Sequence, residues 1–287
     1  MPRFAYVNGR YVRHAAAMVH IEDRGYQFAD GVYEVVTVLN GALVDESLHM
    51  DRLERSLAEL EIPFPASRRV MALVMRELAR RNGLENGLIY LQVTRGVAPR
   101  NHAFPPAGVA PALVMTTRGM DFARMAKFTA GVSVITVPDQ RWARRDIKTI
   151  ALLPNCLAKQ KAVEAGCYEA WQVDGDGCVT EGSSSNAWIL TGDNTLVTRP
   201  LNNDILHGVT RRTVIGLARE AGIALQERPF TVQEAYDAAE AYATSATSFV
   251  TPVVRIDDRP VGTGKPGPFA GRLLAAYRDY AASRGAS

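Results

Sequence analysis

The sequence contains little cysteine and no long apolar segment. Cys156, Cys167 and Cys178 are the three cysteines of the 287 residues, and none forms a CxxC pair. An odd number without that spacing argues against a disulfide framework and against a zinc site. No stretch reaches the roughly 18 apolar residues of a membrane span, and the N-terminal residues lack the apolar core of a signal peptide. We therefore expect a cytoplasmic protein without a metal site or a membrane partner.

The charge balance and the common motifs exclude further classes. The net charge is only +3, and the nearest basic cluster is Arg76, Arg80 and Arg81 in an amphipathic run. This cluster is typical of a solvated helix end, so we expect no nucleic-acid partner. The sequence contains no Walker loop, no GxGxxG that opens a helix, no HExxH and no GxSxG.

Local patterns in the first half predict a sheet with two helices. Asn8-Gly9 and Asn40-Gly41 each separate β-rich segments, which predicts two hairpins because both turn positions favour positive φ. Apolar spacing predicts helices at residues 47–60 and 67–81, with strands at 88–94 and 112–117. In the second helix, the residues expected to face inward are Val70, Leu73, Val74 and Leu78.

The second half predicts strands in the middle with helices around them. Strands are expected at residues 132–137, 169–173, 187–190 and 195–198, and helices at 156–164, 209–221, 232–239 and 269–283. This mixture is typical of the α+β class. We predict a small N-terminal domain at residues 1–118, a linker at 119–124 and a larger C-terminal domain at 125–287.

Lys148 lies in an apolar neighbourhood, between Ile147 and residues 149–153. Burial there would disfavour the charged ammonium and leave the neutral amine that attacks a carbonyl to form a Schiff base. From position alone, a lysine at a strand end with its amine in water is the better interpretation.

Several polar segments offer binding groups. Residues 181–186 (EGSSSN) form a predicted turn whose hydroxyls and N–H groups suit a phosphate. His207 to Arg211 open a helix, where free N–H groups favour an anion, and residues 244–248 add hydroxyls. Arg100 and His102 lie two apart in an extended loop, so their side chains point the same way and suit a carboxylate. Taken singly, each segment is better explained as an ordinary polar turn, a helix cap or a solvated loop.

Together, these segments resemble the D-amino-acid transaminase branch of the aminotransferase family that includes branched-chain aminotransferases and aminodeoxychorismate lyase. The resemblance covers nearly the whole chain in order. It is carried by DRGYQFADGVYE at 23–34 and by residues 49–53, 95–106, 141–148, 157–162, 180–188, 208–211 and 244–252. It implies a two-domain fold of type IV, with an N-terminal α/β sandwich and a β-barrel-like C-terminal domain with outer helices.

The resemblance also implies pyridoxal 5'-phosphate as cofactor and a role for each matching residue. Lys148 matches the lysine that forms the Schiff base and then moves the α-proton. Glu181 matches the carboxylate that faces the pyridine nitrogen and keeps the ring protonated as an electron sink. The residues that match the phosphate-binding groups are Arg52, Val209, Thr210 and Thr247, with Ser183 as a weaker candidate.

The branch is indicated by the residues that match a carboxylate trap. Tyr33, Arg100 and His102 match the side chains that bind the substrate α-carboxylate in D-amino-acid transaminases. In the family the Arg-x-His loop comes from the neighbouring subunit, which implies a homodimer. A carboxylate held there directs the α-hydrogen of a D-substrate at Lys148. Val35 and Thr37 share the Tyr33 face of their strand and are expected to line the substrate pocket.

Two departures leave the substrate range open. Arg145 stands where a smaller residue is expected and would favour acidic substrates, and Thr37 replaces a longer residue. The predicted reaction moves the amino group of a D-amino acid, such as D-alanine or D-glutamate, to 2-oxoglutarate or pyruvate. The alternatives are an L-branched-chain aminotransferase and an R-selective amine transaminase. Less favoured are aminodeoxychorismate lyase and a non-catalytic relative that only binds cofactor.

Overall fold

The computed structural model describes residues 3–125 and 127–284. Two compact units divide the chain. Unit 1 comprises Met1–Phe122, Ile147–Ala151 and Ala281–Ser287, and unit 2 comprises Ala123–Asp146 and Leu152–Tyr280. The linker and the domain bounds expected from the sequence stay a prediction. Among the described residues, no helix has both the length and the apolarity needed to cross a membrane.

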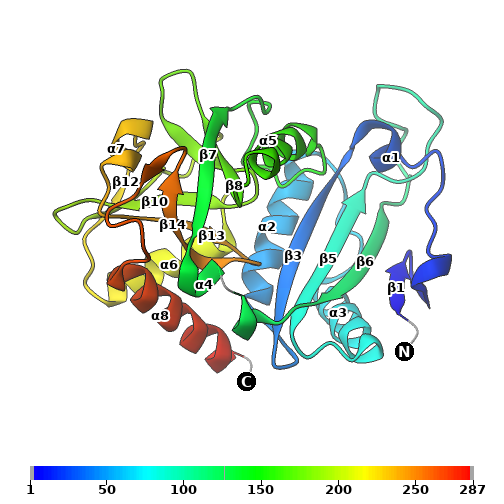
Figure 1. Ribbon diagram of the computed structural model, residues 1–287. Coiled ribbons are helices and arrows are strands. Elements are labelled where there is room, and N and C mark those ends of the chain that lie inside the picture. The colour runs from blue at the N-terminus through cyan, green and yellow to red at the C-terminus, as the bar shows by residue number, and fades with distance from the viewer. Residues whose placement is uncertain (1–2, 126, 285–287) are drawn as a thin grey trace. The chain divides into compact units, whose positions relative to one another are not determined.

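Unit 1 is built on a six-stranded antiparallel sheet (Figure 1). Its order is β2 (Arg10–Arg13), β1 (Phe4–Val7), β6 (Ala112–Gly119), β5 (Gly87–Thr94), β3 (Gly31–Leu39) and β4 (Ala42–Leu43). Both predicted hairpins are confirmed. Asn8 and Gly9 have φ of 45° and 89°, and Asn40 and Gly41 have φ of 51° and 79°, as such two-residue turns require.

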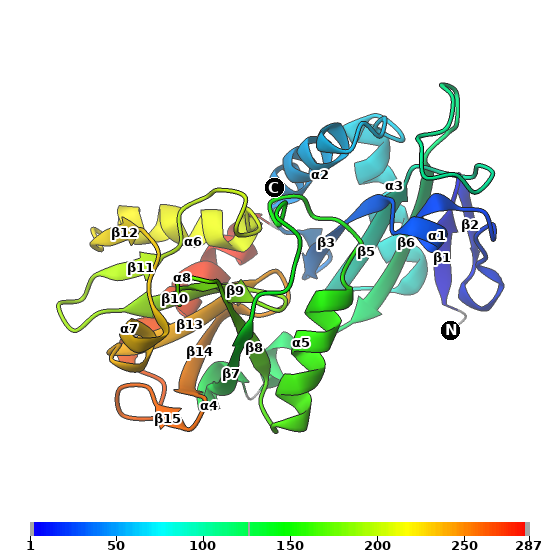
Figure 2. The same cartoon turned by 90° about the horizontal axis from the view of Figure 1, so that it is seen from above.

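Two helices, α2 (Glu46–Glu59) and α3 (Arg68–Asn82), cover one face of this sheet (Figure 2). The Ser67 hydroxyl caps α3 by accepting from the Val70 N–H, and Gly83 ends it in the left-handed conformation. Shorter elements are η1 (His14–Ala16) and α1 (Arg24–Phe28). The core between helices and sheet contains Leu53, Leu57, Met71, Met75, Leu78, Val36, Ile89 and Leu91.

The predicted inward face of α3 is partly wrong. Val74 and Leu78 are buried, but Val70 and Leu73 are 44% and 56% exposed. Met71 and Met75 take the central positions instead, since the buried stripe runs through positions 71, 74, 75 and 78. The four apolar residues chosen from the sequence therefore do not by themselves determine which side of α3 packs on the sheet.

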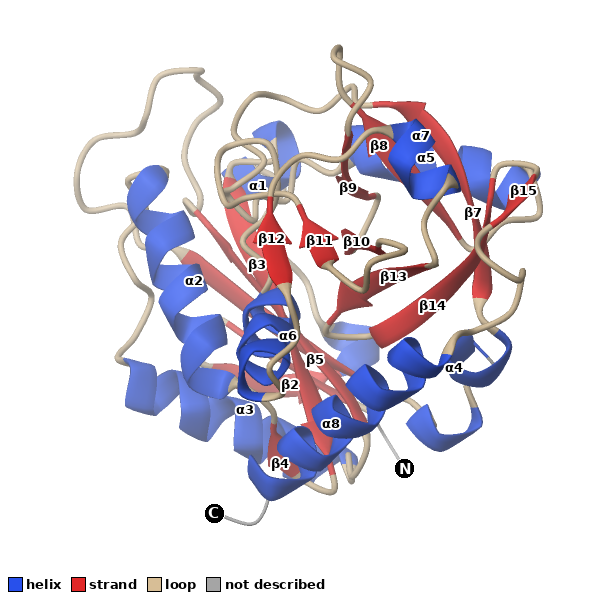
Figure 3. Cartoon of the chain, turned by 90° about the vertical axis from the view of Figure 1, so that its left-hand side faces the viewer, coloured by secondary structure: helices blue, strands red, loops and turns tan. Residues whose placement is uncertain are grey.

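Unit 2 contains a mixed nine-stranded sheet that curls (Figure 3). Its order is β12 (Leu225–Glu227), β11 (Leu196–Thr198), β10 (Asn186–Leu190), β13 (Glu240–Ser245), β14 (Phe249–Ile256), β7 (Val132–Pro138), β8 (Glu169–Val173) and β9 (Val179–Gly182), with β15 (Arg259–Pro260) against β14. The pairs β11–β12, β14–β7 and β7–β8 are parallel, and the other pairs are antiparallel.

Helices surround this sheet, which confirms the predicted α+β class and the curled C-terminal sheet. They are η2 (Phe122–Arg124), α4 (Lys127–Ala130), α5 (Leu153–Glu164), α6 (Val209–Glu220), α7 (Val232–Tyr236) and α8 (Pro268–Arg284). Helix α7 is shorter than the predicted 232–239. A capping box between Thr231 and Glu234 begins it, and its chain leaves the helix at Asp237.

Strand β14 was not expected from the sequence. Pro252 lies within it, opposite Tyr242 of β13, and proline normally excludes a central strand because it has no N–H to donate. On the other side, pairing with β7 is limited to Val253 and residues beyond it, with an irregular register. Pro252 is accommodated because no residue of β7 pairs with it.

Candidate active site

Lys148 belongs to unit 1, where its segment pairs with the start of β3. The Tyr33 N–H donates to the Lys148 carbonyl at 2.9 Å, and the Ile150 N–H donates to the Gly31 carbonyl at 3.1 Å. The Lys148 N–H donates to the Ser56 hydroxyl of α2 at 3.3 Å. The lysine backbone is thus fixed by both the sheet and a helix.

The expected burial of Lys148 is only partly found. Ile147 and Thr149 are buried, whereas Lys148 is half-buried at the centre of a tight turn, which the Thr149 N–H closes by donating to the Ile147 carbonyl at 2.8 Å. Its ammonium lies over the ring of Tyr33, 4.1 Å from the centroid, which is within cation–π distance. The amine predicted to be reactive and the tyrosine predicted to bind a carboxylate are therefore in contact within one unit.

The face of the sheet that carries Tyr33 holds further polar groups. Tyr33 stacks on Tyr90 of β5 at 5.6 Å, and the Tyr90 hydroxyl donates to Gln92 at 2.7 Å. Burial raises the pKa of Tyr90 to about 12, so it remains a hydroxyl. Tyr90 pairs with Val35 and Gln92 with Tyr33. The sequence analysis missed both residues, although period-2 alternation in the strand at 88–94 would have marked them.

Arg52 is held on α2 by a buried carboxylate. Its Nε and Nη2 donate to the two oxygens of Glu34, both at 2.7 Å, and His49 Nδ1 lies 2.7 Å from the same carboxylate. Glu34 points to the helix side of β3, opposite to Tyr33. Although burial opposes ionisation, the Arg52 guanidinium and His49 hold the pKa of Glu34 well below its usual range. The sequence analysis had named Arg52 but not Glu34 or His49.

We expect a Glu34→Gln substitution to lower the free energy of unfolding by about 3 kcal/mol, because it leaves the buried Arg52 without its counter-charge. Since the pKa of Glu34 is lowered by folding, the unfolded chain binds more protons at acid pH. The stabilisation is complete above the unfolded pKa of about 4.3 and is lost as pH falls through the folded value. Urea unfolding between pH 3 and pH 7 measures this.

The control is Glu54→Gln, which lies on α2 like Arg52 and breaks the exposed ion pair between Glu54 and Arg68 of α3. Its expected cost is below about 1 kcal/mol. An equal loss for both variants, or a Glu34→Gln loss that grows on acidification, would contradict the assigned ion pair.

Arg100 and His102 lie in the loop between β5 and β6, and both side chains are exposed. The Arg100 guanidinium stands 4.5 Å from the ring centroid of Phe28, and the His102 ring stands 5.4 Å from the same ring. The two residues are thus gathered on one phenyl ring of α1, in the same unit as Tyr33 and Lys148.

Glu181 lies in unit 2, on strand β9 rather than in the predicted turn, which is limited to Ser183 to Ser185. Its carboxylate accepts from the Asn186 amide at 2.9 Å, from the Leu206 N–H at 3.1 Å and from the Arg141 guanidinium. Burial raises the pKa of Glu181, while Arg141 and the Leu206 N–H act in the opposite direction. In its ionised form, which the Arg141 guanidinium and the Leu206 N–H favour, this carboxylate can accept the N–H of a protonated ring nitrogen.

Arg141 and Arg145 form a charge network behind Glu181. Arg141 also pairs with Asp139 at 2.7 Å, and Arg145 lies 3.3 Å from Asp139 and 3.3 Å from Asp204. The sequence analysis expected Arg145 to add positive charge to the site. In the structure, the carboxylates of Asp139 and Asp204 lie beside Arg145 and offset its charge.

The start of α6 lies beside Glu181. Its N-cap is Gly208, and no side chain caps the helix. A Cβ at Gly208 would clash with the Asn186 amide oxygen, so only glycine permits this approach. The Asn186 amide donates to Glu181 and to the Leu206 carbonyl, and its oxygen lies close to Gly208, the residue before Val209 and Thr210. An uncapped helix start beside a buried carboxylate fits the phosphate and the ring nitrogen of pyridoxal phosphate.

Thr247 lies in a hydroxyl-rich turn held by a lysine that the sequence analysis missed. The Lys127 ammonium donates to the Thr247 carbonyl and to the Ser248 hydroxyl, both at 3.1 Å. The hydroxyls of Ser245 and Thr247 lie 3.2 Å apart. Burial lowers the pKa of Lys127 to about 8. Lys127 thus stabilises the turn, since its ammonium also donates to the Tyr168 hydroxyl, and the Ser245 and Thr247 hydroxyls are the groups of the turn that suit a phosphate.

The three serines of the 183–185 turn face a different group. The hydroxyls of Ser183, Ser184 and Ser185 all lie within hydrogen-bond distance of Glu169 on β8, at 3.2, 2.7 and 2.5 Å. Ser183 is also buried. The turn thus stabilises the buried Glu169 carboxylate. The Ser183 hydroxyl is directed at this carboxylate.

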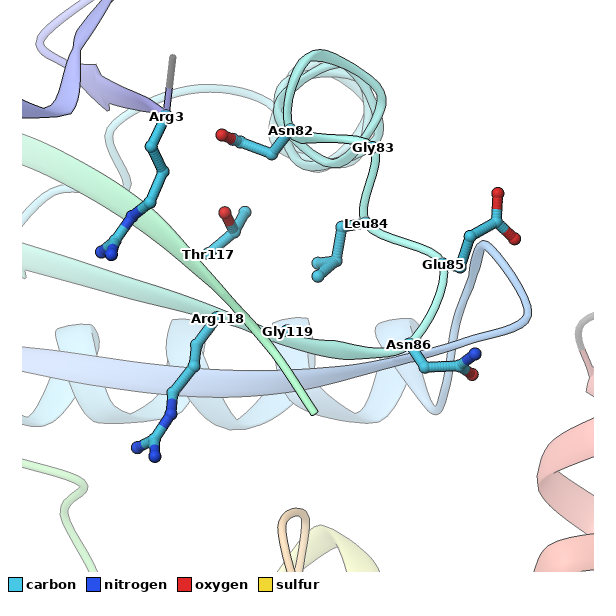
Figure 4. A pocket seen from close by; sticks show the side chains of 9 residues that line it. All are labelled: Arg3, Asn82, Gly83, Leu84, Glu85, Asn86, Thr117, Arg118 and Gly119. Carbon is cyan, nitrogen blue, oxygen red and sulfur yellow. The ribbon is translucent and has the colours of Figure 1, made fainter. Parts of the chain in front are cut away.

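Unit 1 also contains a pocket unrelated to these groups (Figure 4). It is about 350 Å³ in volume and is lined by Arg3, Asn82, Gly83, Leu84, Glu85, Asn86, Thr117, Arg118 and Gly119. None of the predicted site residues lines it.

Comparisons with known proteins agree with these features. Residues 31–256 match the family described as amino-transferase class IV. The chain is 39% identical to a D-alanine aminotransferase of Staphylococcus haemolyticus over 97% of this chain and 98% of that protein. It is 41% identical to a D-alanine aminotransferase of Bacillus licheniformis over 95% of each.

Solved structures share the fold. A branched-chain amino acid aminotransferase of Escherichia coli superposes with a TM-score of 0.92 at 23% identity, covering 99% of this chain and 96% of that one. A branched-chain aminotransferase of the archaeon Thermoproteus uzoniensis, solved with norvaline, gives 0.88 at 25% identity, covering 99% and 96%.

The chain belongs to the class IV aminotransferase family. It is an aminotransferase, and pyridoxal phosphate is its cofactor. The resemblance to the D-amino-acid transaminase branch is confirmed by relatives that are about 40% identical over nearly the full length.

Proposed function

We propose that the enzyme transfers the amino group of a D-amino acid, such as D-alanine or D-glutamate, to a 2-oxo acid such as 2-oxoglutarate or pyruvate. The observation that carries this proposal is the contact between the Lys148 ammonium and the Tyr33 ring. It places the proton-transferring amine beside a residue of the proposed carboxylate trap. The D-alanine aminotransferases at 39% and 41% identity support the same substrate hand.

Each residue set has a proposed role toward the cofactor. Arg52, the first-turn amides of Val209 and Thr210, and Thr247 bind the phosphate, whereas the Ser183 hydroxyl is directed at Glu169. Glu181 holds the proton on the ring nitrogen, and Arg141 and Asn186 hold Glu181. When bound, pyridoxal phosphate supplies an aldehyde carbon and an electron-withdrawing ring.

Lys148 has two proposed roles. Its amine would hold the cofactor, and once free it would take the α-proton of the substrate as a base and give a proton back as an acid. Such transfer requires Nζ to stay on one side of the cofactor ring. The backbone hydrogen bonds of Lys148 to β3 and α2 fix the Cα atom from which this side chain extends.

The substrate is oriented by its carboxylate. Tyr33, Arg100 and His102 bind the α-carboxylate, and Val35 and Thr37 line the adjoining pocket. With the carboxylate fixed there, the α-hydrogen of a D-amino acid faces Lys148, whereas that of an L-amino acid faces away. Binding thereby selects the hand before any bond changes.

A homodimer is proposed as the working unit, in which Arg100 and His102 serve the neighbouring active site. Both side chains are exposed in the single chain. Unit 1 also exposes the large apolar side chains of Met18 at 80%, Ile21 at 76% and Tyr26 at 76%, and exposed apolar surface is typical of interaction sites where it is contiguous. We also propose a cytoplasmic location.

The deciding experiment offers D-alanine and L-alanine separately to the purified holoenzyme and follows the cofactor spectrum in single half-reactions. We expect a complete conversion of the cofactor with D-alanine, reversed by 2-oxoglutarate, and a rate at least about 100-fold lower with L-alanine. Faster conversion with L-leucine, or with an R-amine that has no carboxylate, would replace the proposal with one of those substrate classes.

A further inference from the structure

The loop that carries Arg100 and His102 has no regular structure of its own. It runs from the end of β5 at Thr94 to the start of β6 at Ala112, and residues 100–104 are exposed. Such a loop has many accessible conformations. Two side chains on it can bind a carboxylate together only if other groups fix its backbone.

A buried arginine on α1 supplies that restraint. Arg24 is 3% exposed. Its Nη1 donates to the carbonyl of Asn101 at 2.6 Å and to the carbonyl of Ala103 at 3.3 Å. These two carbonyls flank His102. Hydrogen bonds from a guanidinium are among the strong ones, so the backbone on both sides of His102 is restrained by one side chain.

Arg24 is itself fixed by a carboxylate that it shares. Its Nε donates to Asp30 at 2.7 Å, and Arg95 Nε donates to the same oxygen at 2.8 Å. The rest of the Arg95 guanidinium donates to the carbonyls of Leu60 and Glu61. Asp30 therefore connects the two arginines, and the start of the loop is tied to the end of α2 through Arg95.

Phe28 completes the arrangement. The Arg24 guanidinium lies 4.8 Å from its ring centroid and the Arg100 guanidinium 4.5 Å. The ring thus carries the carboxylate-binding arginine and the anchoring arginine together, and it contacts the His102 ring as well. Cation–π contacts of this kind orient an exposed guanidinium without using its N–H donors.

We infer that Arg24 is a positioning residue for substrate recognition, which holds the loop so that Arg100 and His102 meet the α-carboxylate together. This inference rests on the proposed carboxylate-binding role of these two residues. Arg24 would act on carboxylate binding rather than on proton transfer, because its hydrogen bonds and its ring contact go to Asp30, the loop backbone and Phe28.

The test compares the holoenzyme with Arg24→Gln and Arg24→Lys variants. Arg24→Lys keeps a positive charge beside Asp30, but a single ammonium cannot span Asp30 and both carbonyls, so this variant retains the ion pair and loses the anchor. For both variants we expect the KM for D-alanine to rise about 10- to 100-fold, the range that loss of hydrogen bonds from a charged donor implies. The kcat should change by less than about 3-fold, as expected when only carboxylate binding weakens.

Two further readouts separate positioning from general damage. The inhibition constant of propionate, which presents a carboxylate and no amine, should rise by the same factor as the KM. Hydrogen exchange of the backbone amides of residues 96–104 should accelerate in both variants. In an Arg100→Ala background, Arg24→Gln should add little, because both changes remove one function.

Leu78→Ala is the matched control, since Leu78 is a fully buried core residue of the same unit. It should lower stability and leave the KM and the propionate constant unchanged. The inference is overturned if Arg24→Lys leaves exchange in the loop unchanged, or if the loop loosens while the KM and the propionate constant stay at wild-type values. If the wild-type enzyme takes no D-alanine, the proposed function fails instead, and the exchange measurement still decides whether Arg24 anchors the loop.

Discussion

A Lys148→Ala enzyme is expected to lose transamination by at least about 10³-fold in kcat/KM, because no other side chain is assigned to move the α-proton. Cofactor binding through the phosphate groups should persist, since Arg52 and the start of α6 are unchanged. The measurement is the half-reaction with D-alanine at a saturating concentration of pyridoxal phosphate. The control is Lys161→Ala, which removes an exposed lysine of α5 and should keep wild-type activity.

Residual activity within about 10-fold of the wild type would remove Lys148 from its assigned role. The variant also permits a test of the shared site. At a D-alanine concentration well below the KM of Arg100→Ala, homodimers of Lys148→Ala and of Arg100→Ala should each show little activity, but a mixed dimer would contain one site with both residues intact. Equal mixing and refolding should restore about a quarter of the wild-type activity in a closed two-fold dimer. No restoration would mean that Arg100 serves its own chain.

Glu181→Gln is expected to lower kcat by about 10²- to 10³-fold, the usual cost of losing one preorganised electrostatic group. A glutamine cannot accept the proton that the carboxylate shares with the ring nitrogen, so the ring withdraws electrons less strongly. The buried Arg141 also loses a counter-charge, although Asp139 remains at 2.7 Å. The KM for D-alanine should change little, because the hydrogen bonds of Glu181 go to Asn186, Leu206 and Arg141 and to no carboxylate-binding residue.

The measurement is the rate of the half-reaction together with a pH titration of the cofactor absorbance. Glu164→Gln, an exposed change on α5, provides the control and should match the wild type in both. If Glu181→Gln kept its kcat and its absorbance titration, another group would have to face the ring nitrogen. A loss confined to cofactor affinity would equally contradict the assignment.

Local chemistry was readable where it depends on neighbours in the chain. The hairpins at Asn8-Gly9 and Asn40-Gly41 follow from the positive φ that these residues tolerate. The cap of α3 at Ser67 follows from its hydroxyl. The burial of Val70 and Leu73 was predicted wrongly, because helix rotation depends on what the sheet presents to it. Strand β14 was missed because a proline usually argues against a central strand. Pro252 is acceptable here because no residue of β7 pairs with it, which the sequence does not reveal.

The residues that hold the proposed site residues in place could not be identified from the sequence either. Glu34, His49, Arg141 and Arg24 are ordinary charged residues in the chain. They became recognisable only when the fold placed Glu34 against Arg52, Arg141 against Glu181 and Arg24 against the loop at His102. Such pairs are 18 to 77 residues apart, and no local pattern encodes a contact across that separation.

The sequence by itself determined the family and the cofactor and predicts Lys148 as the reactive lysine, because ordered motifs over nearly the whole chain preserve the residue types that this chemistry requires. It could not determine the state of those residues. Tertiary structure decided that Lys148 is half-buried against Tyr33, that Ser183 serves Glu169, and that Arg145 lies between two carboxylates. Burial, charge and orientation are set by whatever packs against a side chain, and those neighbours come from distant parts of the chain.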